Sequence, residues 1–335
     1  MSSLPEQSAA RRPRPRLAAT SGRGQDDVAT VAAVAELGAR LRTTVETAMR
    51  ISQETLDVVL ATLLAGGHLL VEDHPGVGKT RLARTVAHGL GGRFSRVQAT
   101  VDLLPGDVVG TNVWRAELSS FEFLPGPVFA NVVLVDELNR ATPKTQSGLL
   151  EAMQERQVTV DGCTRPVPAP FTVIATQNPA VGNDGTYPLP PAQLDRFMTQ
   201  ISLGYPSAEQ EVSLLRDGRE PPAQAVGLPS ELLVAQATVA AVHAGDPLLR
   251  YVVSLLEATR RHPLTEVGAS PRAGVLLLAA ARARAALDGR DFVVPDDVQA
   301  LAGPVLTHRI QSIEATSRGA AAQIVAEALA QVPAR

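Results

Sequence analysis

The feature that most constrains the fold is the stretch HLLVEDHPGVGKT, residues 68–80. A short apolar run, typical of a buried strand, leads into a loop with two glycines, and RLARTVAHGL follows with helical spacing. Strand, glycine-rich loop and helix in this order aim backbone N–H groups and the positive end of a helix at one point. The order is typical of a phosphate-binding P-loop, in which Lys79 adds a positive charge and Thr80 a hydroxyl group for Mg²⁺.

One position departs from the P-loop pattern G-x-x-x-x-G-K-[ST], because Asp73 stands at the first glycine. The amides that face a phosphate come later, and Asp tolerates unusual turn conformations. At about 8 Å and an effective dielectric of about 20, this carboxylate would repel a phosphate by roughly 2 kcal/mol. We therefore expect its side chain to point away and cap a local backbone N–H. The residues expected to bind the nucleotide phosphates are Pro75, Gly76, Val77, Gly78, Lys79, Thr80 and Arg81.

Lysine usage supports this interpretation. Only two of the 31 basic residues are lysines, Lys79 and Lys144. A compact ammonium group fits between phosphate oxygens, where a planar guanidinium group would crowd the loop. A chain so biased toward arginine therefore keeps one of its two lysines at the P-loop position.

Two further apolar runs, NVVLVDE and FTVIATQNP, predict strands that end in polar residues. Between them, TPKTQSGLLEAMQERQ has helical spacing and VTVDGCTRPVP predicts a hairpin that turns at Asp161–Gly162. Alternating strands and helices predict an α/β fold, a parallel sheet covered on both faces that binds ligands at the carboxyl ends of its strands. There we expect Asp136 to hold the Mg²⁺ shell, Glu137 to polarise water and Asn178 to hydrogen-bond that water or the γ-phosphate.

Two arginines complete the expected site. Arg196 lies in LPPAQLDRF near the end of the α/β region, and Arg272 lies in GASPRAGV at the start of a later helix. Phosphoryl transfer needs mobile positive charge at the γ-phosphate, and arginine supplies it within a subunit or from a neighbour.

Composition divides the chain into four parts. Residues 1–27 are rich in Ser, Pro, Gly and Arg and predict a disordered tail. Residues 28–205 predict the α/β core with its N-terminal helices, 206–230 a linker, and 231–335 an all-helical second domain. No apolar run approaches the roughly 20 residues of a spanning helix, so no direct membrane insertion is expected. The single cysteine, Cys163, excludes a disulfide framework and a cysteine-based zinc site, and favours a reducing, cytoplasmic setting.

With these motifs in order, the chain resembles AAA+ ATPases and, more narrowly, the MoxR family. The stretches that carry the resemblance are HLLVEDHPGVGKT, LLPGDVVGT, FEFLPGPVFANVVLVDELNRATPKTQSGLLEAMQERQVTVDG, IATQNPAVGNDGTYPLPPAQLDRF and GASPRAGVLLLAAARARAALDGRDFVVPDDV. The resemblance implies an AAA+ core with a P-loop parallel sheet between helices, a C-terminal helical lid, and ATP and Mg²⁺ as cofactors.

The resemblance also assigns roles. It implies Walker A at Lys79 and Thr80, Walker B at Asp136 and Glu137, sensor 1 at Asn178, the arginine finger at Arg196 and sensor 2 at Arg272. RISQE resembles the segment that flanks adenine, through Ile51 and Gln53, although Ser52 stands where the family usually has glycine. Lys144 matches a family position without an assigned role.

An arginine finger that acts on a neighbouring subunit implies an oligomer, and the resemblance implies a hexameric ring. The family acts as chaperone-like ATPases in the assembly of protein complexes or in metal or cofactor insertion. It often works with a partner that carries a von Willebrand factor A domain. The residues do not identify the client or the partner of this chain.

Three other classes were weighed. A DNA-dependent motor or regulator could use the same core, but the hairpin offers only Arg165 and the net charge is −3, so no nucleic acid is expected. A nucleotide-dependent scaffold would bind without turnover, against which the intact Glu137 argues. A GTPase would carry an N-K-x-D signature, which the chain lacks.

Overall fold

The computed structural model describes residues 29–74, 76–178, 186–205, 208–217, 224–313 and 318–334. The expected tail, Pro75 and residues 218–223 of the expected linker lie outside this part of the chain.

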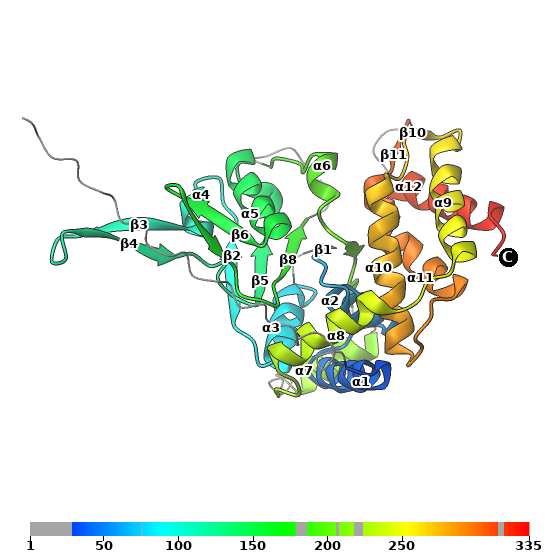
Figure 1. Cartoon of the computed structure of the whole chain (residues 1–335), viewed down its shortest axis with the longest axis horizontal. Helices are drawn as coiled ribbons and strands as arrows, with labels where there is room; N and C mark the ends of the chain where they lie inside the picture. Colours follow the sequence, from blue (N-terminus) through cyan, green and yellow to red (C-terminus); the bar gives the residue numbers. More distant parts are fainter. Residues whose placement is uncertain are drawn as a thin grey trace, which may run out of the picture.

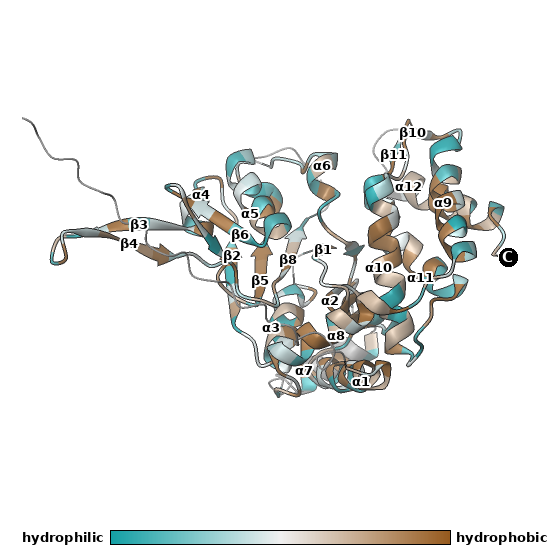
Figure 2. Cartoon of the chain, in the orientation of Figure 1, coloured by the Kyte–Doolittle hydropathy of each residue, from teal (hydrophilic) through white to brown (hydrophobic). Residues whose placement is uncertain are grey.

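A five-stranded parallel sheet forms the centre of the molecule, with strands in the order β2-β5-β8-β1-β9 (Figure 1). The strands are β1 (Leu69–Glu72), β2 (Phe94–Gln98), β5 (Val132–Asp136), β8 (Thr172–Gln177) and β9 (Thr199–Ile201). Strand β5 is buried and hydrophobic along its length (Figure 2). The continuous apolar runs thus follow from burial on both faces, and the predicted parallel sheet is confirmed.

Alternate residues of the strands β1, β5 and β8 enter two different hydrophobic cores. Leu69 and Val71 join one core, whereas Leu70 between them joins the other. Helices α1 (Val31–Ala48), α2 (Gln53–Leu64) and α3 (Lys79–Gly89) pack in the first core, and α5 (Pro143–Glu155) packs in the second. This period of two is what a strand between two helical layers requires.

The C-terminal region is built mainly from helices. They are α8 (Pro229–Ala241), α9 (Asp246–Arg261), α10 (Pro271–Leu287), α11 (Pro295–Leu306), the short 3₁₀ helix η2 (Thr307–Arg309) and α12 (Arg318–Gln331). The predicted helical C-terminal domain is confirmed, and it also contains a short two-stranded ribbon, β10 (Thr265–Val267) with β11 (Gln311–Ser312). Helix α7 (Ala208–Asp217) occupies part of the expected linker.

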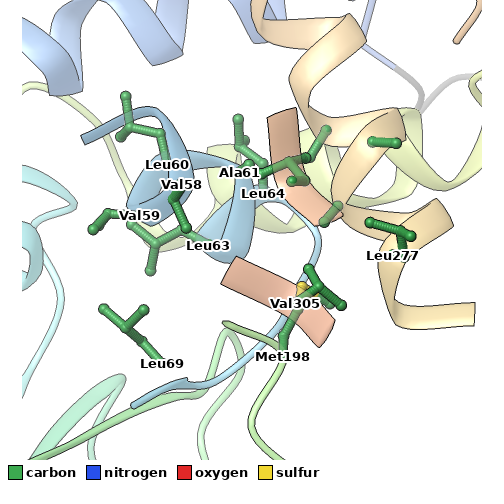
Figure 3. Close-up of a cluster of buried hydrophobic side chains, with 14 of the residues drawn as sticks. Val58, Val59, Leu60, Ala61, Leu63, Leu64, Leu69, Met198, Leu277 and Val305 are labelled. Atoms are coloured by element: carbon green, nitrogen blue, oxygen red, sulfur yellow. The ribbon is translucent and has the colours of Figure 1, made fainter. Parts of the chain in front are cut away.

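The N-terminal helices and the C-terminal helices share one core. Figure 3 shows side chains of α2 beside Leu277 of α10 and Val305 of α11. Helix α1 approaches α10 closely at Gly38, where a Cβ atom would lie 2.3 Å from a methyl carbon of Leu287. A side chain at this position would require Leu287 to move, so the C-terminal helices pack closely against α1 as well as α2.

Two hairpins leave the sheet. The expected hairpin is confirmed as β6 (Gln157–Val160) and β7 (Cys163–Pro166), with positive φ at both turn residues, as a two-residue hairpin turn requires. A second hairpin, β3 (Gly110–Arg115) with β4 (Ser120–Pro125), projects far from the body (Figure 1). Trp114 and Phe121 pair across it with ring centroids 5.2 Å apart, and they are 53% and 69% exposed.

Three short helices lie near the carboxyl end of the sheet or the hairpins. They are α4 (Pro105–Val109), the 3₁₀ helix η1 (Leu138–Arg140) and α6 (Pro191–Leu194). No helix within the described ranges is long and apolar enough to cross a membrane.

A buried histidine makes the stability of the core depend on pH. His68 Nδ1 accepts the N–H of Val173 at 2.9 Å, and its Nε2 lies 3.1 Å from the carbonyl of Met153. Burial, reinforced by the charge of Arg156, lowers the pKa of His68 from 6.5 to about 3. The unfolded chain therefore binds a proton near pH 6.5 that the folded chain rejects, and stability falls as the pH drops from 6.5 toward 3.

From this shift we expect the free energy of unfolding to fall by about 2 kcal/mol between pH 7 and pH 5 because of His68 alone. Urea unfolding of the wild type and of His68→Gln at both pH values measures the contribution, since other titrating groups are common to both chains. The variant should lose about 2 kcal/mol less over this interval. Equal losses in the two proteins would assign the effect to other groups.

Candidate active site

The loop after β1 has a backbone that only glycine adopts readily. Gly76 has φ +89° and Gly78 has φ +98°, and Gly78 is the N-cap of α3. A Cβ atom built at Gly76 would meet no heavy atom within 4 Å, so space lies open beside the backbone there. An open loop at the start of an 11-residue helix fits a phosphate group. Val77 and Thr80 lie half-buried in the same turn.

Lys79 begins α3 and turns back over the end of the sheet. Its Nζ donates to the carbonyl of Asp73 at 2.7 Å and to Asn178 Oδ1 at 3.4 Å. Burial lowers the pKa of Lys79, against the attraction of the Asp73, Asp136 and Glu137 carboxylates. The ammonium group is thus partly stripped of water and held by neutral oxygens, an arrangement that fits the binding of an anion.

The Asp73 side chain points away from the glycine turn, as expected from its charge. It is 5% exposed, and its Oδ2 accepts from the backbone N–H groups of Leu203 and Gly204 and from Ser202 Oγ. These donors follow β9 and lie about 130 residues along the chain, so the expectation of a local cap is wrong. The carboxylate fastens the exit of β9 to the start of the P-loop.

Restoring the usual first glycine with Asp73→Gly should therefore destabilise the protein by about 2–3 kcal/mol. Two backbone N–H groups lose a charged acceptor, and glycine adds flexibility to the unfolded chain. Denaturant unfolding checks this, with Asp73→Asn as the matched control that keeps one oxygen acceptor and loses less stability. An Asp73→Gly protein as stable as the wild type would show that the cap contributes nothing.

The acidic pair lies where β5 ends. Asp136 accepts from Arg96 Nε at 2.7 Å and from Thr176 Oγ1 at 3.4 Å. Glu137 has φ +57°, and its N–H donates to Thr176 Oγ1 at 2.9 Å. This left-handed conformation is uncommon outside glycine, and such backbone gathers at functional sites. The Asp136 carboxylate is paired with the Arg96 guanidinium group, and its expected role in the Mg²⁺ shell together with Thr80 stays a prediction.

Three side chains hold the Glu137 carboxylate. Asn178 Nδ2 donates to Oε1 at 3.1 Å, Gln98 Nε2 donates to Oε2 at 3.2 Å, and Arg140 Nε lies 3.1 Å from Oε2. Since Asn178 also accepts from Lys79, the structure joins Lys79, Asn178 and Glu137 in one line across the ends of β1, β8 and β5.

Sequence reasoning missed Arg96, Gln98, Arg140 and Thr176. Arg96 and Gln98 lie two residues apart on β2, which a period of two places on one face of the strand. This spacing could be read from the sequence. It points to the acidic pair only if β2 is known to lie beside β5, and the order of strands does not follow from the hydrophobic pattern.

The two expected arginines lie at the junction with the C-terminal helices. Arg196 follows α6 and is half-buried, and among the described residues no hydrogen bond or ion pair involves its side chain. Arg272 lies in the first turn of α10, with Nε 3.7 Å from Asp195 Oδ2. The structure thus brings Arg272 to the residue that precedes Arg196.

The segment expected to flank adenine lies beside the P-loop. Arg81 Nε donates to the carbonyl of Ala48, and the methyl carbon of Met49 lies 3.6 Å from the Cβ position of Gly78. Ile51 packs partly against the first core, and Gln53 is exposed at the start of α2. The printed neighbours of the loop are thus Ala48 and Met49, just before this segment, and a contact of Ile51 or Gln53 with adenine stays a prediction.

Comparison with protein families identifies both halves of the chain. Residues 68–199 match the ATPase family associated with various cellular activities, and residues 257–328 match the AAA lid domain. The chain is 44% identical over 268 residues to Chaperone MoxR1 of Mycobacterium tuberculosis, which covers 77% of this chain and 71% of that protein. It is also 35% identical over 285 residues to Protein MoxR of Paracoccus denitrificans, across 76% and 83% of the two chains.

The chain belongs to the MoxR family of AAA+ ATPases.

A solved structure supports the same assignment. A putative ATPase from Cytophaga hutchinsonii superposes with a TM-score of 0.82 at 34% identity, over 91% of this chain and 97% of the other. An MCM homologue from Methanopyrus kandleri shares the fold alone, with a TM-score of 0.56 at 19% identity, over 93% of this chain and 63% of that chain. In this MoxR-family chain the match to the AAA lid runs from the end of α9 into α12, and the match to the ATPase family includes the strands β1, β2, β5 and β8 of the central sheet.

Proposed function

We propose that this MoxR-family chain binds ATP with Mg²⁺ and hydrolyses it to remodel protein complexes. The observation that carries the proposal is the line Lys79–Asn178–Glu137, with contacts of 3.4 and 3.1 Å. A phosphate-binding cation, an amide and an acidic base are thereby joined at one edge of the sheet. Attack of water on a terminal phosphate is promoted by a cation that holds the phosphates and by a side chain that positions or activates the water.

Each residue has a chemical task. The amides at Gly76 and Gly78 with Lys79 would hold the β- and γ-phosphates, and Thr80 with Asp136 would hold Mg²⁺. Bound Mg²⁺ would supply a Lewis acid to the phosphate oxygens. Glu137 would polarise the attacking water, and Asn178 would orient it.

A ring completes the site. We propose a hexamer in which Arg196 reaches the γ-phosphate bound by the neighbouring subunit, while Arg272 acts from the lid of the same subunit. The lack of a partner for the Arg196 side chain among the described residues supports a role outside its own subunit.

The role in protein assembly rests on the family. The relative in Mycobacterium tuberculosis is named a chaperone. We propose that the chain assists assembly of protein complexes, or metal or cofactor insertion into them, together with a protein that carries a von Willebrand factor A domain.

The alternative of a DNA-dependent motor has less support. Arg165, the one basic residue of the β6–β7 hairpin, lies over the Phe123 ring at 3.9 Å and is engaged in a cation–π contact. The test is phosphate release from MgATP by the purified chain with and without double-stranded DNA, at low and high salt. An equal rate of phosphate release with and without DNA supports the protein remodeller, whereas a salt-sensitive increase of that rate by DNA would favour the DNA-dependent motor.

A further inference from the structure

A buried arginine of the lid grips the segment of the core that carries Arg196. Arg309 ends η2, and its side chain is 2% exposed. Its guanidinium group donates four hydrogen bonds to residues 195–198: to Asp195 Oδ1 at 2.8 Å, to the Asp195 carbonyl at 3.3 Å, to the Met198 carbonyl at 3.3 Å and to the Phe197 carbonyl. A fifth donation goes to the carbonyl of Val305, in the preceding helix α11 of the lid.

The buried positive charge of Arg309 is balanced by the Asp195 carboxylate and by hydrogen bonds to backbone carbonyls. Burial lowers the pKa of Arg309 to about 10, while the Asp195 carboxylate opposes the change, so the group stays protonated at neutral pH. A buried cation that lost its partners would be costly, and the planar fork fixes their positions as well as their distance. Asp195, Phe197 and Met198 are therefore held to the lid from both sides of Arg196.

The same carboxylate connects the second lid arginine. Asp195 Oδ1 binds Arg309 and Asp195 Oδ2 lies 3.7 Å from Arg272 Nε, so one acidic side chain lies between two arginines of the lid. On the core side, Phe197 is fully buried in the second hydrophobic core. The backbone at Arg196 is thus clamped between the sheet and the lid, while its side chain extends from the clamp.

We propose that Arg309 is a positioning residue that sets the Arg196 backbone and thereby links the position of the lid to the arginine finger. The inference rests on the proposed role of Arg196 in a neighbouring site. A guanidinium group that must meet a phosphate across a subunit boundary tolerates little displacement, since a shift of about 1 Å can cost about 10²-fold in rate. Movement of α11 and η2 would carry this segment with it.

The first test needs no nucleotide. Amide hydrogen exchange reports the N–H groups of Arg196, Phe197 and Met198, which donate to Gln193, Leu194 and His68 carbonyls. In Arg309→Gln these amides should exchange at least about tenfold faster than in the wild type, because opening of the segment becomes easier, while the amides of α3 stay unchanged. Unchanged exchange at 196–198, or acceleration spread equally over the core, would overturn the proposal.

Arg290→Gln is the matched control. Arg290 also pairs through its guanidinium group with a buried carboxylate, that of Asp297, but entirely within the lid. It should leave exchange at 196–198 as in the wild type. If both variants loosen this segment equally, Arg309 merely stabilises the lid and the proposal fails. Arg309→Lys keeps the charge without the fork and should also loosen the segment, whereas full protection would show that charge alone suffices.

The second test uses mixed assemblies, in which only wild-type subunits hydrolyse ATP. Wild-type protein is combined with a large excess of Glu137→Gln, of Arg196→Ala/Glu137→Gln or of Arg309→Gln/Glu137→Gln. Turnover per wild-type subunit with the Arg309 double variant should fall to the level of the Arg196 double variant. Turnover equal to that with Glu137→Gln alone would overturn the inference. If the Arg196 double variant also has no effect, the arginine finger itself is wrong, which is a failure of the proposed function.

Discussion

Glu137→Gln should lower the rate of ATP turnover by about 10²–10⁴-fold while ATP affinity stays within about threefold of the wild type. The amide of Gln has the shape of the carboxylate but a single acceptor oxygen, so it can keep one of the two hydrogen bonds that Asn178 and Gln98 donate to Glu137. It has no charge with which to polarise water, so only the chemical step should suffer. The phosphate-binding loop lies on another strand and is untouched.

The measurement pairs phosphate release with calorimetric titration of MgATP. Glu151→Gln, at an exposed position of α5, is the matched control and should turn over ATP like the wild type. A Glu137→Gln protein that hydrolyses ATP normally would require a different base. A wild-type protein that binds MgATP but releases no phosphate would revive the nucleotide-dependent scaffold.

Lys79→Ala should weaken ATP binding by about 100-fold or more, equivalent to about 3 kcal/mol. Within the described part of the chain, the hydrogen bonds of the ammonium group go to a carbonyl and an amide oxygen, and burial lowers its pKa, so we expect a triphosphate to supply the negative charge that it binds. Without it, the repulsion between the bound anion and the nearby acids remains unbalanced.

Calorimetry with MgATP again decides the outcome. Lys144→Ala provides the control, since it removes the only other lysine of the chain, at an exposed position of α5. It should retain wild-type affinity for ATP. Equal affinity in Lys79→Ala and the wild type would mean that the loop after β1 does not bind the nucleotide.

Much of the core could be predicted because its signals are local. The apolar runs at β1, β5 and β8 are buried on both faces, and this leaves an uninterrupted hydrophobic pattern. Both residues of the Asp161–Gly162 turn have positive φ, and an Asp-Gly pair is typical of two-residue hairpin turns with this backbone conformation. The β3–β4 hairpin was not predicted, because most residues of its two strands are exposed and no sustained alternation of apolar and polar residues marks them.

The sequence predicted the motif residues of the candidate site but not the tertiary contacts that hold them. Lys79, Asp136, Glu137 and Asn178 follow from strand ends. Arg96 and Arg309 do not, since each meets its partner through a tertiary arrangement that links residues 40 and 114 positions apart. For the same reason, the polarity of Asp73 predicted that it turns away from the loop but not that it caps residues 203 and 204.

The projecting β3–β4 hairpin also determines what tryptophan fluorescence can report about this protein. Its Trp114, on β3, is the sole indole of the chain and is half open to water. Ultraviolet emission from the native chain therefore senses the surroundings of that single outlying ribbon. Binding of a partner to the ribbon would therefore shift the wavelength of tryptophan emission, whereas binding at the nucleotide site would leave that wavelength unchanged.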